Sequence, residues 1–510
     1  MISAEAILLG MSDRPIRFYF RGQIQQISGL PATTTVLQWL REHAHSTGSK
    51  EGCAEGDCGA CTVLVGELDD DGDLRLSNLN SCIQFLPMLD GRALLTVEDL
   101  GDSRTLNPVQ QALVDCHASQ CGFCTPGFAM TLQAIYEHHQ AEGSRPSRQQ
   151  LADELSGNLC RCTGYRPILD AGERMFDAPP RLLDRAPIEA ALESLQADAP
   201  LCYASGADTF HAPRTLSELA ALREAKPAAR LLAGATDVGL WVNKQFRELG
   251  DVIYLGQVQE LRQIEARSAK GQPALWIGAA ASLEDAWAAL SKAVPALREL
   301  WLRFASPPVR HAGTLGGNIA NGSPIGDGAP ALIALGAEIL LRKGASQRRL
   351  LLQDFYLDYM KNALQPGEFV EALLVPKPAA GTALRAYKIA KRYDGDISAV
   401  CAVLSLRLEG DRVTESRLVF GGMAAIVKRA AAAEQALLGQ PWSEATALAA
   451  AAALAQDFQP LSDLRASAAY RLQVAQNLIQ RFWLETRTDA PLSAAQTSVW
   501  QAVSFERSLP

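Results

Sequence analysis

Alternating hydrophobic and polar residues near the N-terminus predict a small β-rich module. Residues 16–20 and 23–27 alternate in this way on either side of an Arg-Gly turn. Residues 62–68 and 74–79 repeat the pattern as a second hairpin around an acidic tip. Between the hairpins, residues 33–44 place apolar side chains at helical spacing. The pattern therefore predicts two hairpins and one helix, joined by a long loop.

Helical signals follow this module. Asn107 stands before a proline, and Gln110 can close a capping box with it, which predicts the start of a helix. Pro126 marks the first turn of a second expected helix. Residues 147–156 predict a third, which ends at a glycine. This part of the chain therefore predicts a small helical domain.

The pattern changes again after residue 176. Residues 176–200 are rich in Pro, Asp, Arg and Ala, which predicts a linker. Strand and helix signals then alternate, and residues 383–390 and 397–420 predict strands near the C-terminus. The helices expected after them cover residues 428–439, 443–456 and 466–486. Their apolar stripes are typical of core-facing helices.

Composition narrows the class of protein. A chain of 510 residues is long enough for about three domains. Its net charge of −8 argues against a nucleic-acid partner, because phosphate binding requires a basic face. The sequence shows neither a signal peptide nor an apolar run long enough for a membrane span. We expect a cytoplasmic protein with reduced cysteines.

The first group of cysteines lies in the loop between the predicted helix and the second hairpin. Cys53, Cys58 and Cys61 have the spacing C-x4-C-x2-C, and Cys82 follows after the hairpin. This is the plant-type ligand pattern of a [2Fe–2S] cluster. Three glycines in the loop allow the backbone to fold tightly around a bulky anion.

A second group lies among the predicted helices. Cys121 and Cys124 form C-x2-C at the start of a helix, and Cys160 and Cys162 form C-x-C after another. Four thiolates from these two pairs can surround one cluster. Cys116 with Cys121 and Cys124 also reproduces the plant-type spacing, so Cys116 remains an alternative ligand. We favour the C-x-C pair because no glycine accompanies Cys116 on its helix.

Structural zinc is the alternative for each cysteine group taken alone, because zinc also takes four cysteines. Two such groups in one chain favour iron–sulfur clusters. Cys202 and Cys401 lie outside both groups.

Two glycine-rich loops stand out in the middle of the chain. Residues 230–239 form a short apolar strand, a glycine turn and the start of a helix, and residues 306–322 are dense in glycine and small polar residues. Such loops bring backbone N–H groups close to a diphosphate, although a plain turn explains each loop equally well. The glycine pattern G-x-G-x-x-G after a strand is missing, so the usual dinucleotide fold is not predicted.

Five motifs together resemble one family. They are EGCAEGDCGACTV, QCGFCTPG, GNLCRCTGYRPI, LLAGATDVG and TLGGNIANGSPIGD. The chain resembles the iron–sulfur and FAD part of the molybdenum hydroxylases over residues 14–485, and within that family it is most similar to the small subunits of bacterial xanthine dehydrogenases. The cysteine motifs are the most specific part of the resemblance, and the C-terminal part is the least specific.

The resemblance implies a multidomain α+β fold. Its parts would be a ferredoxin-like [2Fe–2S] domain (1–95), an α-helical [2Fe–2S] bundle domain (96–175), a linker (176–200), a vanillyl-alcohol-oxidase-type FAD domain (201–380), a C-terminal α+β flavoprotein domain (381–490) and a tail (491–510).

The resemblance also implies the ligands. One cluster would lie on Cys53, Cys58, Cys61 and Cys82, and another on Cys121, Cys124, Cys160 and Cys162. The implied FAD contacts are Leu231, Leu232, Ala233, Gly234, Ala235, Thr236, Asp237, Val238, Phe304, Thr314, Leu315, Gly316, Gly317, Asn318, Asp327, Val370 and Lys388. Val370 and Lys388 rest on looser matching than the others.

The implied function is electron transfer in an NAD-dependent xanthine dehydrogenase, which oxidises hypoxanthine and xanthine to urate. A larger molybdopterin-binding subunit would oxidise the purine, in a heterotetramer of two small and two large chains. Electrons would pass through the helical-domain cluster, the ferredoxin-like cluster and FAD to NAD, with no catalytic residue on this chain. For Asp394 and Asp396 we favour a solvated loop, and a position near the nicotinamide pocket is the alternative. The alternatives are a hydroxylase for aldehydes or other substrates and a zinc-stabilised scaffold.

Overall fold

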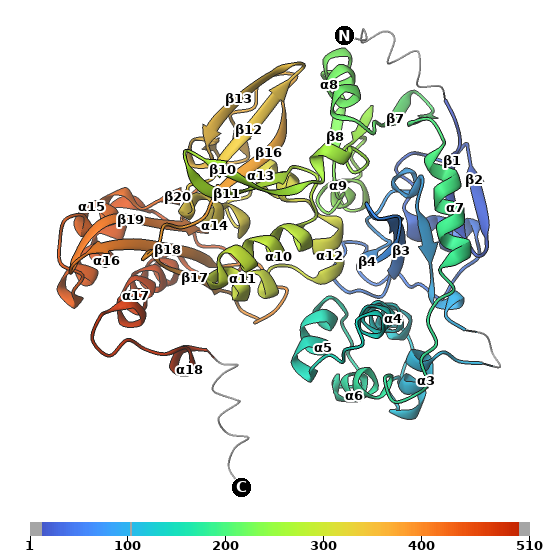
Figure 1. Ribbon diagram of the computed structural model, residues 1–510, viewed down its shortest axis with the longest axis horizontal. Coiled ribbons are helices and arrows are strands. Elements are labelled where there is room, and N and C mark those ends of the chain that lie inside the picture. The colour runs from blue at the N-terminus through green and yellow to red at the C-terminus, as the bar shows by residue number, and fades with distance from the viewer. Residues whose placement is uncertain (1–12, 102–104, 499–510) are drawn as a thin grey trace.

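The computed structural model describes residues 13–101 and 105–498 (Figure 1). In Figure 1, the first β-rich domain (blue) and a helical domain (teal) lie on one side, and the C-terminal domain (orange and red) lies on the other. Two further sheets with their helices occupy the middle. The predicted multidomain α+β fold is confirmed. Within the described ranges, no helix is long and apolar enough to cross a membrane.

The first domain is a five-stranded sheet with strand order β2-β1-β5-β3-β4. Its strands are β1 (Ile16–Phe20), β2 (Gln23–Ile27), β3 (Thr62–Leu68), β4 (Leu74–Asn80) and β5 (Ala93–Leu95). Both predicted hairpins are confirmed. The predicted helix over residues 33–44 is shorter, because Thr35 caps α2 (Val36–Gln38) and the chain then continues as one π-helical turn, Trp39–His43.

The helical domain follows the predicted caps. Its helices are α3 (Pro108–Asp115), α4 (Thr125–Ala141), α5 (Arg148–Glu154) and α6 (Arg166–Arg174). Asn107 accepts a hydrogen bond from the backbone N–H of Gln110, and the Gln110 side chain accepts one in return. Met130, Leu132 and Leu151 are fully buried in its core, which stabilises the bundle.

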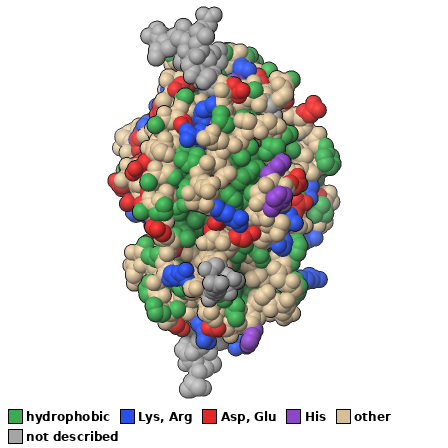
Figure 2. Space-filling view, turned by 90° about the vertical axis from the view of Figure 1, so that its right-hand side faces the viewer, with side chains coloured by type: hydrophobic (Ala, Val, Ile, Leu, Met, Phe, Trp, Pro, Cys, Tyr) green, Lys and Arg blue, Asp and Glu red, His purple; other side chains and the backbone are tan. Residues whose placement is uncertain are grey.

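The segment predicted as a linker contains a helix that the sequence analysis did not predict. α7 (Ala186–Gln196) buries Ile188, Leu192 and Leu195, which recur at helical spacing, and it packs against β1 and β3. The surrounding prolines and charged residues obscured this period. Figure 2 shows the face of the molecule on the side of α7, where hydrophobic side chains gather near the middle.

The middle of the molecule contains two sheets. One has the order β6-β7-β9-β8, with β7, β9 and β8 parallel, and the other is the antiparallel sheet β10-β11-β16-β12-β13. The strands are β6 (Leu201–Ser205), β7 (Asp208–Ala212), β8 (Arg230–Leu232), β9 (Val252–Tyr254), β10 (Ile264–Ala269), β11 (Gln272–Gly278), β12 (Glu338–Lys343), β13 (Ser346–Leu351) and β16 (Phe369–Pro376), with the small pair β14 (Tyr356–Asp358) and β15 (Lys361–Asn362) beside them.

Short helices connect these strands and carry the glycine-rich loops. They are α8 (Leu216–Ala225), α9 (Val238–Asn243), α10 (Leu283–Ala293), α11 (Arg298–Arg303), α12 (Pro307–Ala312), α13 (Leu315–Asn321) and α14 (Gly328–Ala334). Trp287 of α10 is fully buried in the largest core of the molecule, together with residues of α13 and α14.

The C-terminal domain is an antiparallel sheet covered by helices. Its elements are β17 (Ala383–Ile389), β18 (Val400–Glu409), β19 (Arg412–Gly421), β20 (Lys428–Arg429), α15 (Ala431–Leu437), α16 (Glu444–Asp457), α17 (Ala468–Thr486) and α18 (Ala494–Thr497). The predicted helix over 428–439 is wrong at its start, because Lys428 and Arg429 pair with β19 before α15 begins. The predicted strands and the other two helices are confirmed.

Candidate metal and cofactor sites

The first cysteine group gathers between a loop and the end of a hairpin. Cys61 immediately precedes β3, Cys82 follows β4, and the pairing of these strands brings the two together. Both are buried, with 1% and 2% exposed, whereas Cys53 and Cys58 are half-buried. The backbone N–H groups of Glu55 and Cys58 both donate to Cys53 Sγ at 3.4 Å. The loop therefore directs backbone donors at a sulfur, as an anionic cluster requires.

The four sulfurs of this group act on one another. Hydrogen bonds from Cys58 and Cys82 lower the pKa of Cys53, and the same contacts with Cys53 raise the pKa of Cys58 and of Cys82. A hydrogen bond from Cys82 lowers the pKa of Cys61. The structure thus brings together all four predicted ligands of the first cluster, and their donor set fits a [2Fe–2S] cluster.

Glycines of the loop leave no room for side chains. A Cβ added to Gly52 would lie 2.9 Å from Cys58 Sγ, and one added to Gly56 would lie 2.6 Å from a side-chain carbon of Ile83. Gly56 also has a φ of +79°, which other residues rarely adopt. The backbone can fold around the sulfurs because these positions are glycine.

The second cysteine group lies at the surface. Cys121 and Cys162 are exposed, and their sulfurs are 3.5 Å apart. Burial and a contact with Cys160 raise the pKa of Cys124 to about 12. Cys124 is the N-cap residue of α4. The structure therefore brings the two predicted pairs together, with Cys121 against Cys162 and Cys124 against Cys160.

Cys116 ends α3 and interacts with charged groups rather than with another sulfur. Burial raises the pKa of its thiol, and Arg174, Asp170 and Asp115 act on it. Within the described ranges, no three His, Cys, Asp or Glu side chains are arranged around a position for one metal ion. A [2Fe–2S] cluster does not need that arrangement, because its four thiolates are shared between two irons.

The two cysteine groups adjoin each other through backbone. The backbone N–H of Leu159 donates to the carbonyl oxygen of Cys58 at 3.0 Å, and the side-chain amide of Asn158 donates to that of Gly59 at 3.1 Å. A Cβ added to Gly127 would lie only 2.0 Å from the same Gly59 oxygen. The helical domain is thus seated directly on the first cysteine loop.

The two glycine-rich loops in the middle of the chain lie side by side. Residues 233–237 connect β8 to α9, and Thr314 caps α13 by accepting from the Gly317 N–H at 3.1 Å. Asn321 donates to Asp237 at 3.3 Å across the two segments. A Cβ added to Gly234 would lie 1.9 Å from the Ala312 carbonyl oxygen. The backbones of the two loops are therefore in direct contact at Gly234.

The four predicted residues outside these loops are Phe304, Asp327, Val370 and Lys388, and all but Val370 line one cavity. Lys388 Nζ lies 2.5 Å from Asp327 Oδ2, both side chains are 2% exposed, and Ser398 donates to the other Asp327 oxygen at 2.6 Å. Val370 is buried on β16 and packs in the same core as α13. Phe304 ends α11 and stacks on Trp287 with ring centroids 5.9 Å apart.

A cavity of about 240 Å³ joins this group to the first cysteine loop. Phe304, Asp327 and Lys388 line it from one side, and Glu55 and Asp57 line it from the cysteine loop. Burial raises the pKa of Asp57. The sequence analysis missed Glu55 and Asp57, whose contribution depends on how the domains meet.

Asp394 and Asp396 line the same cavity. Burial raises the pKa of Asp394. Burial acts in the same direction on Asp396, but hydrogen bonds from the backbone of Arg392 and Ile397 outweigh it and lower its pKa. The loop is therefore held by its own hydrogen bonds, although Arg392, Asp394 and Ile397 are exposed on it.

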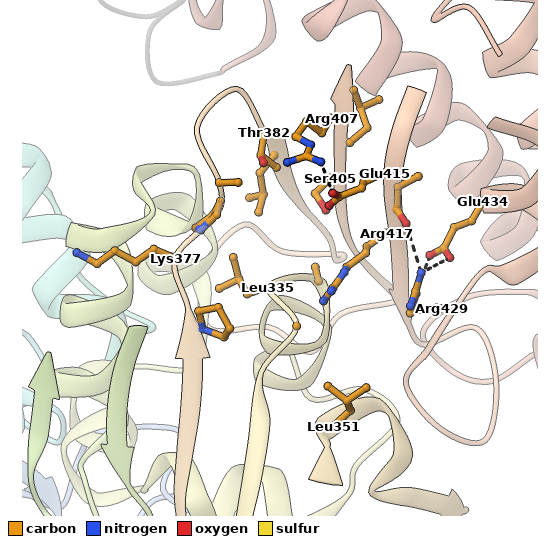
Figure 3. Close-up of a pocket in the computed structure, with 18 of the residues that line it drawn as sticks. Leu335, Leu351, Lys377, Thr382, Ser405, Arg407, Glu415, Arg417, Arg429 and Glu434 are labelled. Atoms are coloured by element: carbon orange, nitrogen blue, oxygen red, sulfur yellow. Dashed lines mark hydrogen bonds and ion pairs between the residues drawn. The ribbon is translucent and has the colours of Figure 1, made fainter. Parts of the chain in front are cut away.

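A larger cleft of about 800 Å³ separates the antiparallel sheet from the C-terminal domain (Figure 3). Arg407 pairs with Glu415 at 2.5 Å, and Arg429 pairs with Glu434 at 2.6 Å. Arg417 donates to a backbone carbonyl at the end of α14 at 3.4 Å. None of the predicted site residues lines this cleft.

Four family models match successive parts of the chain. Their descriptions and ranges are "2Fe-2S iron-sulfur cluster binding domain" (18–85), "[2Fe-2S] binding domain" (96–173), "FAD binding domain in molybdopterin dehydrogenase" (204–378) and "CO dehydrogenase flavoprotein C-terminal domain" (385–486). Each domain that contains predicted cofactor ligands is thus matched by a model of the corresponding kind.

Similar proteins agree with these models. Xanthine dehydrogenase of Emericella nidulans is 31% identical over 92% of this chain, and that of Drosophila subobscura is 33% identical over 80%. The chain covers only 38% and 34% of those relatives. Carbon monoxide dehydrogenase from Hydrogenophaga pseudoflava is similar in structure, with a TM-score of 0.50 and 30% identity over 53% of this chain and 94% of that one. Quinoline 2-oxidoreductase from Pseudomonas putida 86 has a TM-score of 0.50 and 27% identity over 56% of this chain and 98% of that one.

Proposed function

Since this chain belongs to the molybdenum hydroxylase family and carries that family's two 2Fe-2S domains and its FAD-binding domain, we propose that it is the electron-transfer subunit of a xanthine dehydrogenase. It would receive electrons from a larger molybdopterin-bearing subunit and deliver them through FAD to NAD. The chain spans little more than a third of those relatives, and we assign the purine chemistry to the molybdopterin-bearing subunit.

The observation that carries this proposal is the sequence in which the three sites contact one another. The exposed second cysteine group adjoins the buried first group through Leu159 and Cys58. The first group adjoins the glycine-rich loop, because Gln84, two residues after Cys82, donates to the Gly234 carbonyl oxygen at 3.0 Å. The three sites thus adjoin one another in series, and they would serve as a surface entrance, an internal relay and an outlet.

The residues present fit the groups that this route requires. Two sets of four thiols suit two [2Fe–2S] clusters, and the adjoining glycine-rich loops suit the diphosphate of FAD. Bound FAD would supply the change from single electrons to a hydride for NAD. The buried pair of Lys388 and Asp327 would hold the polar edge of the flavin, and Asp394 and Asp396 would border the nicotinamide.

The partner would dock over the second cysteine group. Cys121 and Cys162 are exposed there, and the large apolar side chains of Phe123, Leu159 and Tyr165 are 45%, 42% and 40% exposed beside them. Exposed apolar side chains around an electron entrance are what a partner surface needs. We propose a heterotetramer of two such chains and two larger ones.

The choice of xanthine over another substrate follows from how much of the chain each relative covers. The Emericella nidulans xanthine dehydrogenase matches 92% of this chain, whereas nearly the whole carbon monoxide dehydrogenase chain matches about half of it. The single-chain arrangement of cluster and flavin domains therefore favours xanthine dehydrogenase. A hydroxylase for carbon monoxide, aldehydes or an N-heterocycle is the second candidate, supported by the structural similarity alone.

Copurification from the native host tests the proposal. We expect a larger, molybdenum-containing partner, bleachable flavin and cluster absorption, and reduction of NAD by xanthine. Reduction of the cluster bands by an aldehyde or by carbon monoxide, but not by xanthine, would establish the second candidate instead. A colourless chain with zinc in place of iron would overturn both.

A further inference from the structure

Helix α9 connects the glycine-rich loop to the first cysteine loop. The helix starts directly after residues 233–237 and ends at Asn243, beside the cysteine loop. A Cβ added to Gly239, the second residue of the helix, would lie 2.8 Å from the carbonyl oxygen of Ile83. The helix therefore packs against the residue that follows Cys82. Gln84 adds a second contact between the two segments, because its side chain donates a hydrogen bond to the Gly234 carbonyl oxygen.

Asn243 bonds two backbone segments at once. Its side-chain amide donates to the carbonyl oxygen of Cys82 at 2.7 Å and to that of Ala54 at 3.1 Å. Both amide hydrogens are used, one on a ligand residue and the other on the residue after Cys53. Asn243 thereby sets the separation between the fourth ligand and the loop that carries the other three.

Lys244 places a positive charge on the same loop. Its ammonium group donates to the Cys53 carbonyl oxygen at 2.5 Å, and it lies 3.9 Å from the Glu55 carboxylate. A cluster with four thiolates gains a negative charge when it is reduced, so a nearby cation favours the reduced form. The Lys244 side chain is 42% exposed, so solvent weakens this effect without removing it.

The second cysteine group has a different arrangement of donors. The N–H of Phe123 and the sulfur of Cys162 lower the pKa of Cys121, and both Cys121 and Cys162 face solvent. The lysine and the bridging amide belong to the first group, so a change at Asn243 or Lys244 acts on one cluster and leaves the other as an internal reference.

We propose that Asn243 and Lys244 are positioning residues of the first cluster: Asn243 fixes its ligand loop against the flavin loop, and Lys244 raises its reduction potential relative to that of the second cluster. This inference rests on the proposed function, because it requires both clusters to be present. It assigns to the FAD domain a part in tuning a cluster whose ligands all belong to another domain.

A redox titration followed by EPR tests the role of Lys244. In the chain loaded with both clusters, Lys244→Gln should change the equilibrium electron distribution between the two clusters about fivefold, away from the first. A tenfold change would correspond to about 59 mV for a one-electron couple. Lys244→Arg, which keeps the charge, should stay close to wild type. No shift in Lys244→Gln, or an equal shift of both clusters, would overturn the electrostatic role.

A chelator assay tests the role of Asn243. Asn243→Ala should release iron from the first cluster several-fold faster and alter the EPR line shape of that cluster only. Asn477→Ala, on the exposed side of α17, is the matched control and should change neither. Unchanged release and line shape in Asn243→Ala would overturn the inference. If the wild-type chain itself showed no cluster signals, the proposed function would fail instead, so the two failures are distinguishable.

Discussion

Each of the two cysteine groups contains four thiols, but the surroundings of the two groups differ. In the first group, Cys61 and Cys82 are buried and the surrounding loop is bonded from two other domains. In the second group, Cys121 and Cys162 face solvent. The number and type of ligands are therefore insufficient to assign a role. Position distinguishes a relay enclosed by protein from an entrance that a partner can reach.

Burial also changes the free-energy cost of reducing each cluster. Adding an electron to an anionic cluster is less favourable away from water, so a buried cluster needs donors and cations from its surroundings. The first loop receives them from the backbone and from Lys244. In the second group, solvent would stabilise more of the negative charge of the cluster. This difference makes the two clusters separately testable.

The largest effect is expected from removing one ligand in each group. Cys82→Ser should abolish the first cluster and Cys162→Ser the second, because three thiolates cannot complete the four-ligand set. Iron content per chain should halve in each, and each variant should lose a different EPR signal. Cys116→Ser should keep all the iron. Loss of iron in Cys116→Ser would instead show that Cys116 is a ligand.

Replacing a glycine at the contact between the two cysteine groups should destabilise the protein more than replacing one at the edge of the same domain. Gly59 has a φ of +70°, and its Cβ would lie 2.2 Å from the Gly157 carbonyl oxygen. Gly59→Ala should cost about 3 kcal/mol in the free energy of unfolding, from backbone strain and the clash together. Gly91 has a φ of +75° and open space around it, so Gly91→Ala should cost about 1 kcal/mol. Equal losses in thermal unfolding would contradict the close contact.

A smaller loss is expected from the polar link between the groups. Asn158 is buried, donates to Gly59 and Thr62, and accepts from Thr131 at 2.8 Å. Asn158→Ala leaves these groups unpaired and should lower the free energy of unfolding by about 2 kcal/mol. Denaturant titration of the wild-type chain and the variant measures this loss in the free energy of unfolding. A neutral result would mean that the contact is solvated and contributes little.

The smallest effect concerns the surface of the second group. Phe123→Ser should weaken binding of the larger subunit about tenfold, because it removes apolar area at the centre of the proposed interface. Calorimetry of the two subunits measures this change. Leu461→Ser is the control, since Leu461 is 82% exposed on the C-terminal domain. Both variants should keep their cluster signals. If the control weakened binding as much, the interface would have to be placed elsewhere.

Local signals explain what could be predicted from the sequence. The capping box at Asn107 and the hairpin of β3 and β4 depend on neighbouring residues, and both appear as expected. Cysteine spacing is local as well, and it indicated the two groups that the structure brings together. The assignment of individual ligands and flavin contacts remains a prediction.

Other features depend on tertiary packing, or their local signal was obscured by neighbouring residues. α7 was hidden among prolines and charges, and the strand at Lys428 exists because β19 lies beside it. Asn243 and Lys244 look like the ordinary end of a helix in the sequence. Their contacts with the cysteine loop arise because the distant FAD domain packs against it.

Gly59 packs against the backbone of Gly127 and Gly157, and the side-chain amide of the buried Asn158 lies at the same junction, bonded to the Gly59 carbonyl oxygen. Exposed side chains hop between rotamers, whereas packed main chain and a buried, hydrogen-bonded amide are held in place, so this junction resists widening. Tunnelling rates fall steeply with distance. A junction packed this closely would therefore hold the distance constant for an electron that passes between the two proposed clusters.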